Sequence, residues 1–141
     1  MNATLAVAAA VAFCWLGMVL AISFIEAPLK FRAPGVTLQI GLGIGRKVFR
    51  ALNSVESLFA AVILVILLTQ HPSTPITVAF AVAILALAIQ LLAVRPKLTQ
   101  RSDAVLAGLD APRSTAHYYY VGLEAAKVIG LLVAGILLLA G

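Results

Sequence analysis

Three of the five acidic residues of the chain, Glu26, Glu56 and Glu124, lie in or at the edge of long apolar stretches. Ionisable groups inside a membrane helix are costly, and they are usually paired or functional. Counted from the basic ends of these stretches at about 1.5 Å per residue, each carboxylate lies roughly 5–10 Å below the membrane surface. Because the three come from different stretches, they form one polar cluster if those helices are neighbours. Such a cluster is suited to holding a proton, an ion or a small solute.

Three more polar side chains accompany Glu124 in the last apolar stretch. His117, Tyr120, Glu124 and Lys127 follow the spacing i, i+3, i+7 and i+10, which places all four on one face of a helix. Glu124 and Lys127 are close enough on that face to form an ion pair. Two interpretations of the cluster stay open: a site for a proton, ion or substrate, or polar contacts that join helices at ~1 kcal/mol each.

Basic side chains open the second apolar stretch. Asn53 and Glu56 share a helix face there, with Arg46 and Arg50 nearer its basic end. The glycine-rich run 41–47 just before them resembles a phosphate-cradling loop at a helix start, although its spacing is not that of a dinucleotide fingerprint. A flexible interfacial turn is the favoured interpretation of this run, and an anionic ligand or a lipid headgroup is the functional one.

The sequence gives little indication of a metal site or of a reactive thiol. The single Cys14 has no charged neighbour, and we interpret it as a small packing residue. His71 and His117 fall at opposite ends of the predicted bundle, so one subunit cannot hold one haem with both. We therefore expect no metal site. No arrangement of nucleophile and base stands out, and the question of enzymatic activity stays open.

Four apolar stretches carry these residues, near 5–25, 52–68, 76–94 and 119–140. The chain has 141 residues, 63% of them hydrophobic, and a mean hydropathy of +1.12. A hydrocarbon core of about 30 Å takes roughly 20 apolar residues per helix. The sequence thus predicts an all-α integral membrane protein, with residues 1–141 forming a single domain that is a bundle of four transmembrane helices.

The basic residues predict how this bundle is oriented. Nine of the ten Lys and Arg residues fall in two connecting segments, 26–50 and 95–117, and only Lys127 lies elsewhere. Basic loops stay on the cytoplasmic side, so both chain ends are expected outside. This topology accounts for the net charge of +5, and we expect contact with anionic lipid headgroups rather than nucleic acid.

Apolar residues alternate with polar residues and glycines over residues 36–45 of the first basic segment. A strand at a membrane surface would leave its edges unpaired. We therefore predict an interfacial coil or a short re-entrant segment here. In the second basic segment an amphipathic stretch precedes a turn, and Ser114 or Thr115 is a suitable N-cap for the last helix.

Two family resemblances add to these expectations. The strings Trp15-Leu16-Gly17-Met18 and Ser23–Arg32, with Gly45, Phe49, Arg113 and His117, resemble the family of small four-helix membrane proteins that includes transmembrane protein 205. That resemblance implies a four-helix bundle without a settled biochemical activity, loosely associated with metal or drug resistance.

The second resemblance is to the membrane-associated glutathione and eicosanoid enzymes. Arg46, Arg50, Ala51, Asn53 and Glu56 are similar to that family's second-helix signature, with one residue fewer between Ala51 and Asn53. The resemblance implies that Arg46, Arg50, Asn53 and Glu56 bind glutathione at a trimer interface, where an arginine lowers the pKa of its thiol.

The function expected first is the handling of a small solute, a metal or a proton-coupled cargo through the carboxylate cluster. The alternatives are a glutathione-dependent membrane transferase and a structural subunit of a membrane complex. The Ala-rich first and third helices favour the last of these, because small residues allow close helix contacts. Since four helices rarely enclose a transport path alone, we expect a homo-oligomer or a partner membrane subunit. Glutathione is the one cofactor suggested, and only by the transferase alternative.

Overall fold

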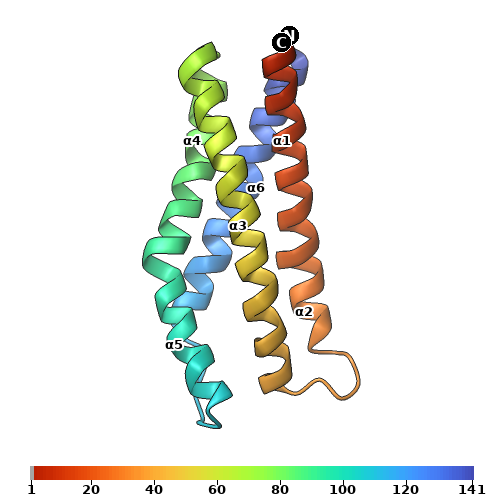
Figure 1. The fold of residues 1–141 in the computed structure, drawn as a ribbon, viewed down its shortest axis with the longest axis vertical. Coiled ribbons are helices and arrows are strands. Elements are labelled where there is room, and N and C mark those ends of the chain that lie inside the picture. Colours follow the sequence, from red (N-terminus) through yellow and green to blue (C-terminus); the bar gives the residue numbers. More distant parts are fainter. Residues whose placement is uncertain (1) are drawn as a thin grey trace.

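The computed structural model describes residues 2–141, which form a bundle of four long helices and contain no strand (Figure 1). The first long helix joins α1 (Ala3–Val19), the π-helical segment η1 (Leu20–Glu26) and α2 (Ala27–Lys30). The second is α3 (Leu38–Gln70). The third joins α4 (Thr74–Ile89), the π-helical segment η2 (Gln90–Val94) and α5 (Arg95–Leu106), and the fourth is α6 (Thr115–Ala140).

All four helices are long and apolar enough to cross a membrane. They contain the four predicted stretches, and this confirms a multi-pass, all-helical membrane protein. Both chain ends lie at one end of the bundle, together with the turn between α3 and α4 (Figure 1). The loops 31–37 and 107–114 lie at the other, which we call the basic end.

The first connecting segment differs from its prediction. The expected interfacial coil or re-entrant segment over residues 36–45 is wrong, because α3 is helical from Leu38 onward, capped by the Thr37 hydroxyl, which accepts a hydrogen bond from the Ile40 amide at 3.2 Å. The glycines allow another part of the chain to pack closely against this helix. Gly41 and Gly45 are four residues apart and share one helix face. A Cβ at Gly41 would lie 2.1 Å from the Phe31 ring, so this face receives the returning chain.

Two prolines lie inside the first and third long helices instead of ending them. Pro28 does not end the first helix, which continues to Lys30. Each proline follows a π-helical segment by two residues: η1 ends at Glu26 before Pro28, and η2 ends at Val94 before Pro96. A proline ring clashes with the carbonyl four residues earlier. The wider π turn moves that carbonyl aside, which lets the helix go on.

The core of the bundle lies on the side of the chain ends and is built from small residues around a few large ones. Ala12, Ala83 and Ala134 are fully buried, and Trp15 and Phe80 fill the space between the helices. Helix α6 packs closely on α4 and α1. A Cβ at Gly130 would lie 2.8 Å from the Ala79 carbonyl oxygen, so a glycine is required at this crossing.

This crossing gives a testable prediction. Gly130→Ala should lower the free energy of unfolding in detergent by about 1–3 kcal/mol, because the added methyl group meets backbone rather than a movable side chain. Gly122→Ala on the same helix is the matched control, since nothing lies within 4 Å of its Cβ position. Circular dichroism during thermal unfolding measures both. Equal shifts for the two variants would contradict the close α4–α6 contact.

Candidate functional site

A buried ionic network joins α3 and α6. Glu56, Glu124 and Lys127 are at most 1% exposed. The Lys127 ammonium donates to the Glu56 carboxylate, and its Nζ lies 2.5 Å from Glu124 Oε1. A single cation therefore pairs with carboxylates from two helices, and such pairing is what a low-dielectric interior requires of buried charges.

Neutral donors from the other helices complete this network. Trp15 Nε1 on α1 donates to Glu56 Oε2 at 2.8 Å. Gln90 Nε2 donates to Glu124 Oε1 at 2.9 Å and to the Tyr120 carbonyl at 3.1 Å. The Ser23 hydroxyl donates to the second oxygen of Glu124. Ser23 and Gln90 come from η1 and η2, so both π-helical segments deliver a donor to the same carboxylate.

The network holds one more negative than positive group when both carboxylates are ionised. Both oxygens of Glu124 accept hydrogen bonds, whereas Glu56 Oε1 is buried and has no hydrogen-bond partner among residues 2–141. An unsatisfied oxygen of this kind is a natural position for a proton or a water molecule. The network can therefore take up one positive charge without rearrangement of its other contacts.

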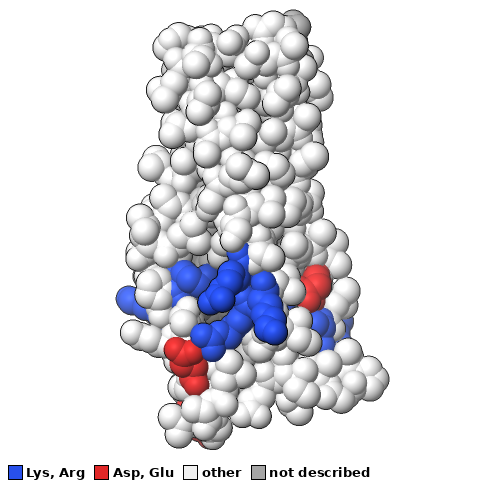
Figure 2. Space-filling view, in the orientation of Figure 1, with Lys and Arg blue, Asp and Glu red and all other residues white. Residues whose placement is uncertain are grey.

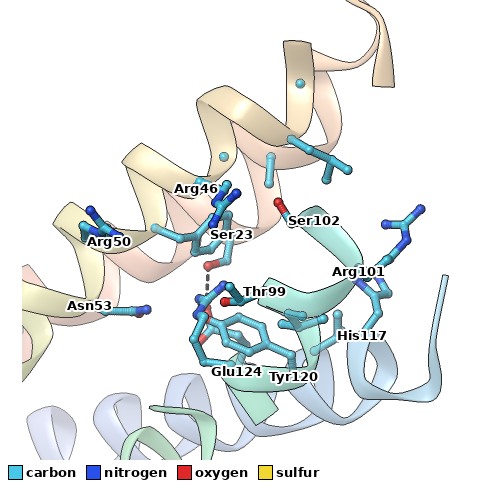
Figure 3. A pocket seen from close by; sticks show the side chains of 18 of the residues that line it. Ser23, Arg46, Arg50, Asn53, Thr99, Arg101, Ser102, His117, Tyr120 and Glu124 are labelled. Carbon is cyan, nitrogen blue, oxygen red and sulfur yellow. Dashed lines mark hydrogen bonds between the residues drawn. The ribbon is translucent and has the colours of Figure 1, made fainter. Parts of the chain in front are cut away.

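A cavity of about 550 Å³ lies beside the network at the basic end, between α3 and the other three long helices (Figure 3). Its polar lining includes Ser23, Asn53, His117, Tyr120 and Glu124. Aromatic and aliphatic side chains form the rest of its wall, among them Phe24, Phe31, Leu42, Phe49, Leu91, Leu98 and Val121. An apolar wall with a few polar groups is typical of sites for organic molecules.

Five basic side chains line the same cavity: Lys30, Arg46, Arg50, Arg95 and Arg101. Basic side chains gather around a hollow on the side of the bundle, towards its basic end (Figure 2). Lys30 pairs with Glu26 at 3.7 Å, and Arg46 pairs with Asp103 at 2.7 Å. Within the described part of the chain, the other three guanidinium groups form no ion pair with a carboxylate.

Arg95 is held in place by aromatic side chains instead. It donates to the Tyr120 hydroxyl at 2.9 Å, and its guanidinium lies 4.8 Å from the Tyr120 ring centre and 5.5 Å from that of Phe49. These contacts position a cation without neutralising it. Arg95 Nε, Asn53 Oδ1 and Ser102 Oγ are buried and have no hydrogen-bond partner among residues 2–141. All three residues line the cavity, which therefore has unused donors and acceptors.

The structure brings together most of the candidate residues, though in two groups. Glu56, Glu124 and Lys127 form the ionic network, and the expected Glu124–Lys127 pair is present. His117 and Tyr120 line the cavity beside Glu124. Glu26 does not join the carboxylates, because it turns to Lys30 and is 38% exposed.

The residues suggested by the glutathione-enzyme resemblance also divide. Arg46, Arg50 and Asn53 line the cavity, whereas Glu56 lies behind it in the ionic network. Sequence reasoning did not single out Trp15, Ser23, Gln90 or Arg95. The signal available for Gln90 was its position as the only amide in the stretch 76–94.

Comparison with protein-family models, with curated proteins and with solved structures gives no match. The chemistry of the site is thus read from its residues alone. Guanidinium groups pair with carboxylates and phosphates through charge-assisted, often bidentate hydrogen bonds. The described residues hold no group of three or more His, Cys, Asp and Glu side chains that could bind a metal ion. The cavity is therefore best suited to an organic anion.

The central position of Lys127 gives a prediction. Lys127→Met should destabilise the protein by about 3–5 kcal/mol, because it leaves two buried carboxylates without a cation. Adding Glu56→Gln to that variant should restore part of the stability by removing one of the two charges. Thermal unfolding in detergent measures both, with Lys97→Met on the exposed face of α5 as the control. A Lys127→Met protein as stable as the control would contradict the network.

Proposed function

We propose that this protein binds a small organic anion in the basic cavity and handles it as a membrane cargo. The observation that carries the proposal is a set of three arginines, Arg50, Arg95 and Arg101, that line one cavity and form no ion pair with a carboxylate among residues 2–141. Arg95 and Arg101 are partly buried in this partly apolar space, where a charge without a counter-ion is unfavourable. A bound anion relieves that cost and uses the free polar atoms of Asn53 and Ser102.

An anionic cargo fits this lining better than a metal ion or another cation. The one carboxylate that lines the cavity, Glu124, already accepts from Lys127, Gln90 and Ser23. A free cation would compete with the Lys127 ammonium and would meet five basic side chains on its way to Glu124. The carboxylate cluster therefore acts as the floor of the site and not as the ligand set for a cation.

The same floor supports the proton coupling expected from the sequence. An anion that enters the cavity approaches Glu124 and the excess negative charge of the network. A proton taken up at Glu56 Oε1 would remove that excess, so the anion and the proton favour each other's binding. Proton-coupled transfer of an organic anion is the form of cargo handling that this arrangement supports.

A glutathione-dependent transferase is the second candidate. It is favoured by the position of Arg46, Arg50 and Asn53 around one cavity. Glutathione is itself an organic anion, and a nearby guanidinium would stabilise its thiolate. Turnover of an electrophilic substrate separates the two candidates, because a cargo handler would bind glutathione without consuming it.

The orientation and the assembly belong to the same proposal. The basic segments 26–50 and 95–117 lie on the cytoplasmic side, with both chain ends outside. A homo-oligomer or a partner membrane subunit completes the cargo path, since four helices rarely enclose such a path alone. A purely structural subunit would not need the unpaired guanidinium groups.

Anion binding is tested with the purified protein and citrate, phosphate and glutathione as probes. Arg50→Gln should weaken binding roughly tenfold, because it removes one charge-assisted hydrogen bond worth about 1.5 kcal/mol. Lys47→Gln, on the exposed side of the same helix and outside the cavity, is the matched control. Isothermal titration calorimetry measures the affinities. Equal affinities for the two variants, or no binding of any probe by the wild type, would overturn the proposal.

Orientation is tested by cysteine labelling in a Cys14→Ser background. The exposed Ser73, in the turn between α3 and α4, and the exposed Leu109, in the loop before α6, are each replaced by cysteine. An impermeant maleimide should label Ser73→Cys in intact cells and Leu109→Cys only after permeabilisation. The reverse pattern would show that the basic end faces outward.

A further inference from the structure

The level of the cavity along the bundle follows from the helix lengths. Helix α3 has 33 residues and is about 50 Å long, whereas a hydrocarbon core is about 30 Å thick. At the end of the bundle that holds the chain termini, the helices contain no Lys or Arg. Nine of the ten Lys and Arg residues lie in the segments 26–50 and 95–117, towards the basic end. The core therefore covers the apolar part, and α3 extends beyond it at the basic end.

About 20 residues cross the hydrocarbon core, so its basic boundary can be found by counting from the opposite end. On α3, counted back from Gln70, the boundary falls at Arg50. On the third helix, counted from Thr74, it falls beside Arg95. On α6 and the first helix it falls at Tyr120 and Ser23. All four residues line the cavity, which thus lies at the level of the lipid headgroups.

The cavity also opens in the right direction for a lipid. Figure 2 views the bundle from the side, and the hollow ringed by Lys and Arg lies on this side face and not at the tip of the bundle. Residues of α5 and of the start of α3 also line the cavity, among them Arg101 and Gly41. A molecule lying in the leaflet could therefore place its headgroup in the cavity without leaving the membrane.

The lining matches the two parts of such a molecule. Arg50, Arg95 and Arg101 line the cavity and form no ion pair among residues 2–141, although Arg95 donates to the Tyr120 hydroxyl and Arg101 to the Ala111 carbonyl. Their remaining N–H groups can bind a phosphate or carboxylate. The Phe24 side chain lines the cavity and is also 40% exposed on the outer surface of the first helix, and Val121 on α6 is likewise 40% exposed. These two side chains carry the apolar wall of the cavity out to the lipid-facing surface, where an acyl chain would lie.

We infer that the anion bound in the cavity is the headgroup of an amphiphile, a phosphate or carboxylate on an acyl chain, which enters sideways from the leaflet. The inference rests on the proposed function and names its substrate class. A soluble phosphate or carboxylate shares the headgroup chemistry but lacks the chain, so the two sources are separable by experiment. The sequence suggested an anion site at the helix N-terminus formed by residues 41–47. The site proposed here is formed instead by side chains that line the cavity.

The test uses the full chain in phosphatidylcholine nanodiscs with radiolabelled single-chain phosphatidate as the probe. Unlabelled single-chain phosphatidate should displace the probe. Glycerol 3-phosphate should compete at least about 100-fold more weakly, because no chain holds it in the leaflet. Single-chain phosphatidylcholine should compete as weakly, since its headgroup carries no net charge. Arg50→Gln should lower the affinity for the probe roughly tenfold, and the matched Lys47→Gln should leave it unchanged.

The outcomes separate the inference from the proposal beneath it. Glycerol 3-phosphate competing as well as the single-chain lipid would overturn the lipid inference and leave an anion site. If single-chain phosphatidylcholine displaced the probe as well as single-chain phosphatidate does, the site would recognise the acyl chain and not the charge of the headgroup. That result would overturn the inference. An absence of saturable probe binding to the wild type, together with no binding of citrate, phosphate or glutathione, would overturn both. The competition series needs only the wild type, so it stands even if a variant fails to fold.

Discussion

The buried ammonium of Lys127 forms ion pairs with Glu56 and Glu124, and these pairs hold the polar centre of the bundle together. A carboxylate cannot stay ionised and unpaired among apolar helices, and neither can an ammonium. Lys127 pairs with Glu56 and Glu124, so α3 and α6 must meet at one depth. Trp15, Ser23 and Gln90 then bring the first and third helices to the same point. In a bundle whose other contacts are mostly small and apolar, this directional network sets how the four helices are rotated about their axes.

Pro28 and Pro96 also shape the site, through the π-helical segments that precede them. Each of them requires a wider turn before it, and the resulting π-helical segments present Ser23 and Gln90 to Glu124. The cavity lies beside those segments, between α3 and the other long helices. The network and the cavity are thus neighbours in the same local geometry: polar donors converge on Glu124, and basic side chains line the cavity beside it. Similar use of π-helical turns at functional sites is common.

Much of the fold follows from composition, and much of the site does not. Length and hydropathy predicted the four spans, and the three-residue spacing of Glu124 and Lys127 predicted their ion pair; the structure confirms both. The helix over residues 38–45 was missed because glycines mask the helical period, and their role became clear only from Phe31 packing on Gly41. Glu26 was grouped with the other carboxylates by depth alone, but its side chain points to Lys30, which depends on helix rotation. Arg95 could not be identified from sequence, because its importance comes from Phe49 and Tyr120 on other helices.

We propose that Arg50, Arg95 and Arg101, which form no ion pair among residues 2–141, make this cavity at headgroup level a site for an anion drawn from the membrane. Native mass spectrometry of the protein released from mild detergent tests it most directly, because a molecule bound in the cavity should survive extraction. We expect a retained adduct with the mass of an anionic lipid or lipid-like acid, present in wild type and Lys47→Gln and depleted in Arg50→Gln. A wild-type spectrum without any adduct, or with zwitterionic lipid bound equally to all three proteins, would contradict it.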